Sequence, residues 1–390
     1  MVASPLIAVV ERPAVAAPAA VAAGMARVAV GPPAVRLAGL GLALPPHPVD
    51  ADELGRVLAR VWPHRARHLP ALVRELAGSR RWLARPPADL GRGMTLAEQG
   101  LRYPELATEL AAAACRHALS GAGVPASAVD LLVVASCTGF VLPGPDSRLV
   151  AALGLREDVT RLPLTQLGCA AGAAGLGRAA EWLRGAGRPD RPGIALVAAV
   201  ELPSLTFQPG DDSVDNLLSA LVFGDGAGAA VLIGPGGDGH AGGLDILRTG
   251  ERLVPASGDA LGYRLDDHGF RVHLVRDLPE RLAAVLPDVV ATFLAPDRAP
   301  DCRVVAAHPG GPRIIDAVAR SLEVGEAAVA ASRAAFERAA NPSSAGVFFV
   351  LDAAMHPSPP AGTRGLLLGL GPGLTLELLE LRWPAPEPSR

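Results

Sequence analysis

The chain has 390 residues, of which half are hydrophobic and 19% are charged, and its formal net charge is −3. This composition excludes a generally disordered chain, and the near-neutral charge excludes a protein that binds nucleic acid electrostatically. The chain contains no lysine, so enzymes that depend on a lysine Schiff base are excluded as well.

The cysteines and the hydrophobic segments narrow the class of protein further. Four cysteines lie far apart, at positions 115, 137, 169 and 302, and none belongs to a Cys-x-x-Cys pair. Neither a disulfide framework nor a zinc site is expected from this spacing, and no metal is predicted. No apolar stretch is long enough to cross a membrane, and residues 1–24 lack the basic start of a secretory signal. We therefore expect a cytoplasmic protein that does not bind membranes.

In chain order, the sequence predicts a disordered extension followed by alternating helices and buried strands. Residues 1–27 form the extension, with Met25 as an alternative translation start. A strand and loop are expected over 28–44, and an arginine-rich helical region over 50–85. Further helices are expected over 101–121, 168–183, 312–322 and 343–355. Buried strands are expected over 129–136, 193–200 and 304–307, and strand pairs around glycine turns over 220–233 and 365–381.

The two halves of the chain show the same coarse order of elements. In each half, buried strands and helices alternate, and a strand, a glycine turn and a second strand come last. This order favours two copies of one α/β unit over two unrelated domains. The predicted boundaries are 28–236 for the N-terminal half and 237–384 for the C-terminal half, followed by a short tail over 385–390.

Cys169 is the candidate nucleophile. It lies at the predicted start of a helix whose first turns are almost entirely alanine and glycine. Free backbone N–H groups and the helix dipole lower the pKa of a thiol at such a position. A small buried cysteine on a closely packed helix fits the same pattern, so the local sequence leaves both interpretations open.

His308 and Asn341 are candidates for the same site in the second half. His308 follows a predicted strand and precedes a Pro-Gly-Gly-Pro turn, which places it at the rim of the sheet, where α/β folds bind ligands. A loop histidine bonded to the local backbone is the alternative. Asn341 precedes a proline and a predicted helix, which is typical of a helix N-cap.

Five motifs that surround these residues resemble the type III polyketide synthases, the chalcone and stilbene synthase-like family of the thiolase superfamily. They are QLGCAAG at 166–172, FGDGA at 223–227, AHPGGP at 307–312, NPSSA at 341–345 and GLGPGLT at 369–375. Each motif alone is weakly specific, but all five occur in the order of the family. The resemblance implies a thiolase-like α/β fold, in which two similar halves form a five-layer αβαβα arrangement.

The resemblance implies that Cys169 carries the acyl chain and that His308 and Asn341 complete a catalytic triad. An imidazolium would hold the thiolate, and a starter acyl-CoA would transfer its acyl group to sulfur. Decarboxylation of malonyl-CoA would leave an enolate that accepts hydrogen bonds from His308 and Asn341. Both CoA thioesters are substrates in this scheme, and neither a cofactor nor an acyl carrier protein is implied. Repeated extension and cyclisation would give an alkylresorcinol, an alkylpyrone or a tetrahydroxynaphthalene.

A substrate cavity is also implied by the resemblance. Phe223 matches the aromatic gatekeeper of the family, while Val272 stands where plant members carry a second phenylalanine, which implies a wider throat. Cys137 replaces a threonine of the plant enzymes, and either a polarizable contact to the polyketide or a small filler at the end of a strand fits this position. Leu142 falls where the family inserts a residue into the cavity of the partner subunit, so a homodimer is implied. The other cavity residues are Thr138, Thr206, Gly310, Gly311 and Ser343. Arg74, Arg80 and Arg81 are candidates for the CoA phosphates, and a solvated helix face explains these arginines equally well.

Two alternative functions remain open at this point. A ketoacyl synthase of the fatty-acid initiating type shares the fold and the Cys/His/Asn chemistry, although that family usually carries His-Gln-Ala-Asn where this chain has His308-Pro309-Gly310-Gly311. A non-catalytic thiolase-fold subunit that binds acyl-CoA is an alternative of another class, but retention of all three triad residues argues against it.

Overall fold

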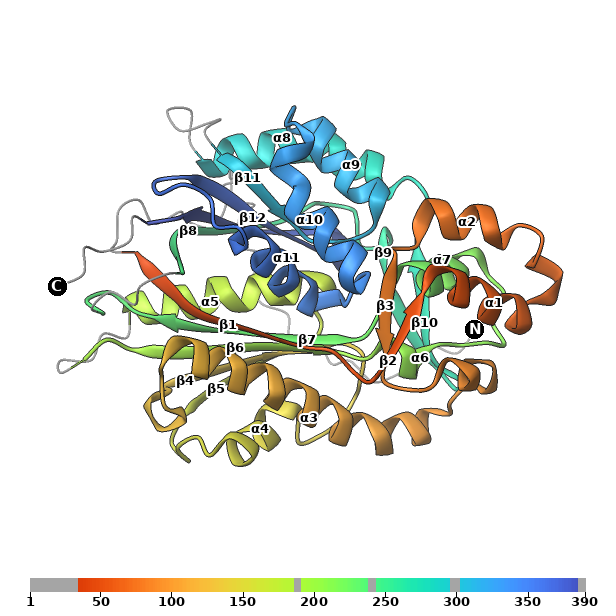
Figure 1. Cartoon of the computed structure of the whole chain (residues 1–390), viewed down its shortest axis with the longest axis horizontal. Coiled ribbons are helices and arrows are strands. Elements are labelled where there is room, and N and C mark those ends of the chain that lie inside the picture. Colours follow the sequence, from red (N-terminus) through yellow and green to blue (C-terminus); the bar gives the residue numbers. More distant parts are fainter. Residues whose placement is uncertain (1–33, 186–190, 238–242, 295–301, 385–390) are drawn as a thin grey trace, which may run out of the picture.

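A computed structural model describes residues 34–185, 191–237, 243–294 and 302–384 (Figure 1). The predicted extension over 1–27 and the predicted tail over 385–390 lie outside the described residues. Within the described ranges, nine strands form one sheet in the order β11-β12-β13-β8-β1-β7-β6-β4-β5. Their bounds are β1 Val35–Ala43, β4 Leu131–Ala135, β5 Thr160–Leu164, β6 Ile194–Glu201, β7 Gly226–Ile233, β8 Leu244–Leu253, β11 Cys302–Ala307, β12 Arg364–Gly371 and β13 Thr375–Arg382.

The two halves of this sheet have the same pairing pattern. In the first half, β4 runs parallel to β6, β6 antiparallel to β7, and β7 antiparallel to β1. In the second half, β11 runs parallel to β12, β12 antiparallel to β13, and β13 antiparallel to β8. The prediction of a duplicated α/β unit is therefore confirmed. A short antiparallel pairing between β1 and β8 joins the two halves.

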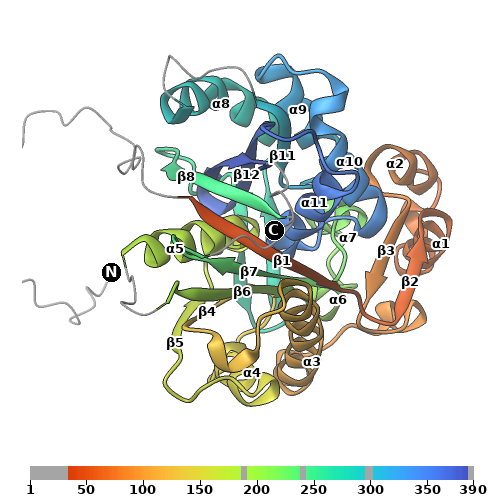
Figure 2. The same ribbon diagram turned by 60° about the vertical axis from the view of Figure 1, so that its left-hand side comes forward.

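Helices and half-sheets stack in five layers, as the resemblance implied (Figures 1 and 2). Helices α5 (Ala171–Gly185) and α11 (Gly346–Met355) lie between the two half-sheets and share one apolar core with strands of both. The outer layers are α3 (Leu96–Ala122) with α4 (Pro145–Leu153) on one side, and α8 (Leu278–Leu294) with α9 (Pro312–Ser321) on the other. Helix α10 (Glu326–Ala339) packs against α9, α11 and β11.

The alanine- and glycine-rich start of α5 is required by this central layer. A Cβ on Gly172 would lie 2.0 Å from the carbonyl oxygen of Ser344, so even a methyl group is too large there. The close packing brings the start of α5 against the short turn that precedes α11. The packing interpretation of the sequence around Cys169 is therefore correct, and it does not compete with a role for the thiol.

Two local predictions are wrong. The segment 220–233 is not a strand pair, because α7 (Val214–Val222) ends at the Phe223 turn and only β7 follows. The segment 50–85 is not helical throughout. It contains α1 (Ala51–Val61), a 3-10 turn η1 (Pro63–Arg65), α2 (Leu69–Leu76) and β3 (Arg80–Leu83), which pairs with β2 (His47–Asp50).

A hairpin that the sequence analysis did not predict lies beside the main sheet. Its strands are β9 (Leu261–Asp266) and β10 (Gly269–Leu274), and they form a separate two-stranded sheet. The remaining short elements are η2 (Pro87–Arg92), η3 (Ala126–Ala128), α6 (Pro203–Thr206), η6 (Pro372–Leu374) and two 3-10 turns named below. Over the part of the chain that is described, no helix combines the length and the apolarity needed to span a membrane.

Candidate active site

Cys169 lies in the 3-10 turn η4 (Gly168–Ala170) that leads directly into α5. The preceding Gly168 has a φ of +50°, and a Cβ there would lie 2.6 Å from the Pro372 ring, so glycine is required on both grounds. The Cys169 thiol is buried, and its Sγ lies 3.4 Å from the Ser343 Oγ.

His308 lies directly after β11, at the rim of the sheet where the sequence placed it. Its backbone N–H donates to the Leu368 carbonyl oxygen at 2.8 Å, which extends the parallel pairing by one residue. The turn that follows contains Gly311, with a φ of +117°, and leads into α9. The imidazole is buried, and its Nδ1 has no hydrogen-bond partner among the described residues.

Asn341 is held between α10 and the 3-10 turn η5 (Ser343–Ala345) by its backbone. Its N–H donates to the Val222 carbonyl at 3.0 Å, and its carbonyl accepts from the Gly224 N–H at 3.1 Å. The side-chain Oδ1 accepts from the Ser343 N–H at 2.9 Å, which is a local Asx turn rather than the predicted N-cap. This turn does not use the amide NH₂, and Asn341 lines the same pocket as Cys169, whose pKa its side chain lowers.

The side chains of Cys169, His308 and Asn341 line one pocket, although they are far apart in the sequence. Apart from these three groups the lining is almost entirely apolar. It includes Val222, Phe223, Leu261, Val272, Leu274, Leu278, Leu282, Ile314, Leu370 and Leu374. A nucleophile, an imidazole and an amide donor are thus placed together in a pocket with an almost entirely apolar lining, where polar interactions are stronger than in water.

Burial shifts the pKa of the Cys169 thiol and that of the His308 imidazole in the directions that favour their neutral forms. Desolvation raises the pKa of the Cys169 thiol to about 12, against the opposing hydrogen bond to Ser343. Desolvation lowers the pKa of His308 to about 3. The start of a helix therefore does not make Cys169 a thiolate by itself. A charged pair requires the sulfur to pass its proton to the imidazole, since the two opposite charges then stabilise each other.

Glu201 is a buried acidic residue beside this pocket that the sequence analysis missed. It ends β6, and its carboxylate accepts from the Cys137 N–H at 3.1 Å and from the Thr138 hydroxyl at 2.7 Å. The Ser344 hydroxyl also donates to it. Burial raises the pKa of Glu201, and these hydrogen bonds oppose that shift. An acidic residue that ends an otherwise apolar strand was the available signal.

The two thiols near the pocket share one hydroxyl contact. Cys137 Sγ lies 3.6 Å from the Ser343 Oγ, which also contacts Cys169, and 3.4 Å from the Glu201 Oε1. Burial and the adjacent Glu201 raise the pKa of Cys137 well above its usual value. Cys137 is therefore a neutral, polarizable wall group at neutral pH.

A second pocket lies on the other side of Phe223 and Val272, which line both pockets. Cys169 also faces both. The predicted cavity residues Cys137, Thr138, Thr206 and Ser343 line this second pocket, whereas Gly310 lines the first. Tyr263 and Phe270 of the hairpin complete its wall, and neither was predicted.

Both family models for chalcone and stilbene synthases match the chain, the N-terminal domain over residues 98–237 and the C-terminal domain over 245–383. The chain belongs to the chalcone and stilbene synthase family. It is a type III polyketide synthase, an acyltransferase that forms carbon–carbon bonds, so the ketoacyl synthase and non-catalytic alternatives are set aside.

Relatives of this synthase include bacterial enzymes with aromatic products in their names. A 1,3,6,8-tetrahydroxynaphthalene synthase of Streptomyces peucetius subsp. caesius is 37% identical over 89% of this chain and 93% of the relative. A phloroglucinol synthase of Pseudomonas fluorescens is 31% identical over 78% of this chain and 86% of the relative. The solved 1,3,6,8-tetrahydroxynaphthalene synthase of Streptomyces coelicolor matches with a TM-score of 0.80 and 30% identity, covering 90% of this chain and 99% of that one.

The predicted role of Arg81 in binding the CoA phosphates is wrong. Arg81 is buried and donates to the carbonyl oxygens of Ala220, Leu221 and Phe223, so it caps the last turn of α7. A guanidinium committed to three backbone carbonyls in the interior is not available to a phosphate. Arg74 and Arg80 are exposed, and their role stays a prediction.

Two further predicted residues lie outside both pockets. Gly311 forms the turn before α9 and does not line the first pocket. Leu142 lies on the loop after β4 with 94% of its surface exposed, beside a larger hollow that Cys137 and Tyr263 also line.

Proposed function

We propose that this synthase extends an acyl starter on Cys169 by repeated decarboxylative condensation with malonyl-CoA, without an acyl carrier protein or a bound cofactor. The observation that carries the proposal is the placement of Cys169, His308 and Asn341 around one apolar pocket. The second pocket, reached past Phe223 and Val272, is the space in which the chain grows and cyclises.

Acyl transfer begins when His308 takes the proton of Cys169. The thiolate attacks the thioester carbonyl of the starter, the carbon–sulfur bond to CoA breaks, and CoA leaves with the proton from the imidazole. Neither group needs to be charged at rest, because the proton moves between two buried groups that line one pocket. The acyl chain is then linked to a sulfur that faces both pockets.

Decarboxylation uses His308 in a second role, together with Asn341. The apolar lining disfavours the malonyl carboxylate and favours its loss as CO₂, which leaves the bonding electrons on the thioester as an enolate. The imidazole N–H and the Asn341 NH₂ donate to the enolate oxygen, and each such donor lowers a barrier by about 3–4 kcal/mol. The carbanion attacks the acyl group on Cys169, a new carbon–carbon bond forms, and the thiolate is released.

The relatives favour the tetrahydroxynaphthalene type among the three product classes. Two tetrahydroxynaphthalene synthases resemble this chain over most of its length. A tetrahydroxynaphthalene skeleton can be built from malonyl units alone, so malonyl-CoA would serve as both starter and extender. Val272 leaves the throat wider than an aromatic side chain would, and Cys137 lies in the cavity wall. Both features favour a polyketide chain that folds near Cys169.

We propose a homodimer in which Leu142 enters the cavity of the second copy. Phe140 and Leu142 are 77% and 94% exposed, and Leu265 beside the same hollow is 52% exposed. Large apolar side chains gathered next to a catalytic cavity are typical of a covered interface.

Arg313 is the arginine best placed for the CoA phosphates. It lies at the start of α9, between the pocket-lining residues Gly310 and Ile314, and is 63% exposed. Its guanidinium pairs with Glu75 of α2 at 2.5 Å, and Arg74 is the neighbour of that glutamate. An arginine fork suits phosphate recognition.

The direct test is to incubate purified protein with malonyl-CoA and a panel of starter thioesters, and to determine product masses. We expect malonyl-CoA to be consumed without an acyl carrier protein and to yield a cyclised aromatic or pyrone product. Extension that occurs only when malonate is carried on a carrier protein would overturn the proposal.

A further inference from the structure

The β9–β10 hairpin forms one wall of the cavity from outside the main sheet. Tyr263, Phe270 and Val272 line the reaction cavity, while both strands lie outside the nine-stranded sheet. Side chains alternate along β10, so Arg271 points away from the cavity between Phe270 and Val272. What fixes the outer face of the hairpin therefore also fixes Val272.

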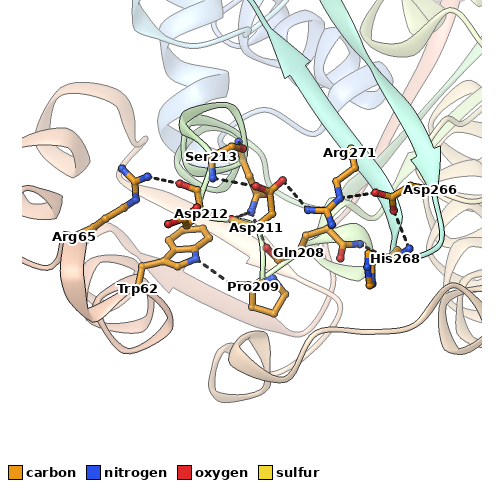
Figure 3. A network of polar contacts seen from close by, with 11 residues as sticks. Trp62, Arg65, Gln208, Pro209, Asp211, Asp212, Ser213, Asp266, His268 and Arg271 are labelled. Atoms are coloured by element: carbon orange, nitrogen blue, oxygen red, sulfur yellow. Dashed lines mark hydrogen bonds and ion pairs between the residues drawn. The ribbon is translucent and has the colours of Figure 1, made fainter.

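Arg271 joins the hairpin to the loop that contains Asp211 (Figure 3). Its guanidinium lies 3.0 Å from the Asp211 Oδ2, and its Nε donates to the Asp266 Oδ2 at 2.8 Å. Asp266 belongs to the hairpin itself, whereas Asp211 lies on the loop 207–213, which follows Thr206. Thr206 and Val272 line the same cavity, so the Arg271–Asp211 pair spans its two walls from outside.

The loop 207–213 is itself anchored to the N-terminal helices. The Trp62 Nε1–H donates to the Pro209 carbonyl at 3.0 Å, and Arg65 donates to the Asp212 carbonyl (Figure 3). The Trp62 ring packs edge-on against Phe207, with centroids 5.5 Å apart. This loop is thus a fixed support to which the hairpin can be attached.

A second contact, between Gln208 and His268, holds the hairpin turn against the same loop. The Gln208 Nε2 donates to the His268 carbonyl at 2.7 Å. Gly269 has a φ of +114°, and a Cβ there would lie 2.9 Å from that Gln208 nitrogen, so the turn sits directly on the loop. Gln208 holds the turn. Arg271, together with the Leu274 N–H that donates to Asp215 at 3.1 Å, holds the strand that carries Val272.

From these contacts we propose that Arg271 is a positioning residue, which fixes Val272 relative to Thr206 through Asp211 and thereby sets how far the chain grows before release. This inference rests on the proposed function, because it concerns the same cavity. Without the pair, the hairpin keeps its contacts at Tyr263 and Leu274 but loses its tie beside Val272. Its middle can then shift outward, the throat beside Cys169 widens, and water reaches the thioester sooner. Shorter products then form at the expense of the full-length one, while loading of Cys169 is unchanged.

The test compares five substitutions by their product distributions with malonyl-CoA. We expect Arg271→Ala and Asp211→Asn to raise the share of shorter products several-fold, with malonyl-CoA consumption little changed. Asp266→Asn removes only the contact within the hairpin and is expected to behave like the wild type. Arg264→Ala is the matched control, because Arg264 is the exposed cross-strand partner of Arg271. Arg271→Lys, which can still reach one carboxylate, is expected to restore part of the full-length product.

The outcomes separate this inference from the proposed function. A wild-type protein that forms no polyketide would overturn the proposed function. Normal wild-type products together with an unchanged distribution in Arg271→Ala and Asp211→Asn would overturn the positioning role. Equal shifts in Arg264→Ala or Asp266→Asn would also contradict it, since the effect would then not depend on the pair that spans the cavity. If Arg271→Ala fails to fold, Asp211→Asn decides the question, because its amide keeps the acceptor for the Ser213 N–H.

Discussion

Phe223 and Asn341 form an isolated parallel backbone bridge. The gatekeeper candidate of the first half and the amide of the second half are therefore held in fixed register, independently of their side chains. Substitution of either side chain leaves the hydrogen bonds of the bridge in place. The contributions of the two side chains can thus be separated by mutation.

Asn341→Asp tests the oxyanion role without removing the local turn. The aspartate retains an oxygen that accepts from the Ser343 N–H, but it lacks the NH₂ donor. We expect the rate of malonyl-CoA decarboxylation, measured as CO₂ release, to fall by about 10²–10³-fold. The decarboxylation rate of Asn341→Ala should fall at least as far. A wild-type rate in Asn341→Asp would show that Asn341 does not stabilise the enolate oxygen.

His308→Gln tests whether the imidazole accepts the proton of Cys169. Burial raises the pKa of that thiol, so without the imidazole its thiolate becomes more abundant only as the pH rises. We expect iodoacetamide to alkylate Cys169 at pH 7 at least ~100-fold more slowly in the variant, with a rate that increases about tenfold per pH unit. The wild-type rate should vary little between pH 6 and 8. Peptide mass analysis gives the rate for Cys169 alone, and parallel pH profiles for the two proteins would contradict the role.

Glu201→Gln tests the buried carboxylate as a structural centre of the cavity wall. A glutamine has one acceptor oxygen in place of two, so several of the buried donors around it lose a partner. Each lost partner costs about 1–3 kcal/mol, and we expect the Tm to fall by several degrees. Glu105→Gln, on the exposed face of α3, is the control and should unfold at the wild-type temperature. An unchanged Tm in Glu201→Gln would show that the network does not stabilise the fold.

Arg313→Ala tests the proposed phosphate contact. We expect the KM for malonyl-CoA to rise about tenfold with little change in kcat, because one charge-assisted contact that binds substrate and transition state equally is lost. Malonyl N-acetylcysteamine lacks the phosphates, so its KM should not change. A similar rise for both thioesters would place the effect in the pocket and not at the phosphates. Arg74→Ala gives the matching measurement for the neighbouring helix.

The sequence predicted the elements of the fold where one physical signal dominated. Residues 194–200 form a continuous apolar run, which a strand buried on both faces requires, and they are β6. The turn at Phe223-Gly224-Asp225 is compatible with both a hairpin and a helix–strand junction, and the strand pair predicted there is wrong. The i, i+4 spacing of the buried Leu217 and Leu221 was the signal for α7.

Only part of the site was predicted correctly, because the charge of a residue does not show where its side chain points. Arg81 had been assigned to a phosphate, but the short β3 strand turns it inward to the end of α7. Glu201 gave no functional motif, and its role depends on Cys137 and Ser344 from distant segments. The hairpin that carries Val272 had an alternating pattern around Gly269, which is typical of two short strands.

The most direct measurement of the central claim is to map the acyl adduct after the purified protein has been incubated with a starter acyl-CoA alone. The account predicts one acyl group on the peptide that contains Cys169, and no adduct in Cys169→Ala, while Cys137→Ala is still loaded. An adduct on a different cysteine, or polyketide formation by Cys169→Ala, would contradict it.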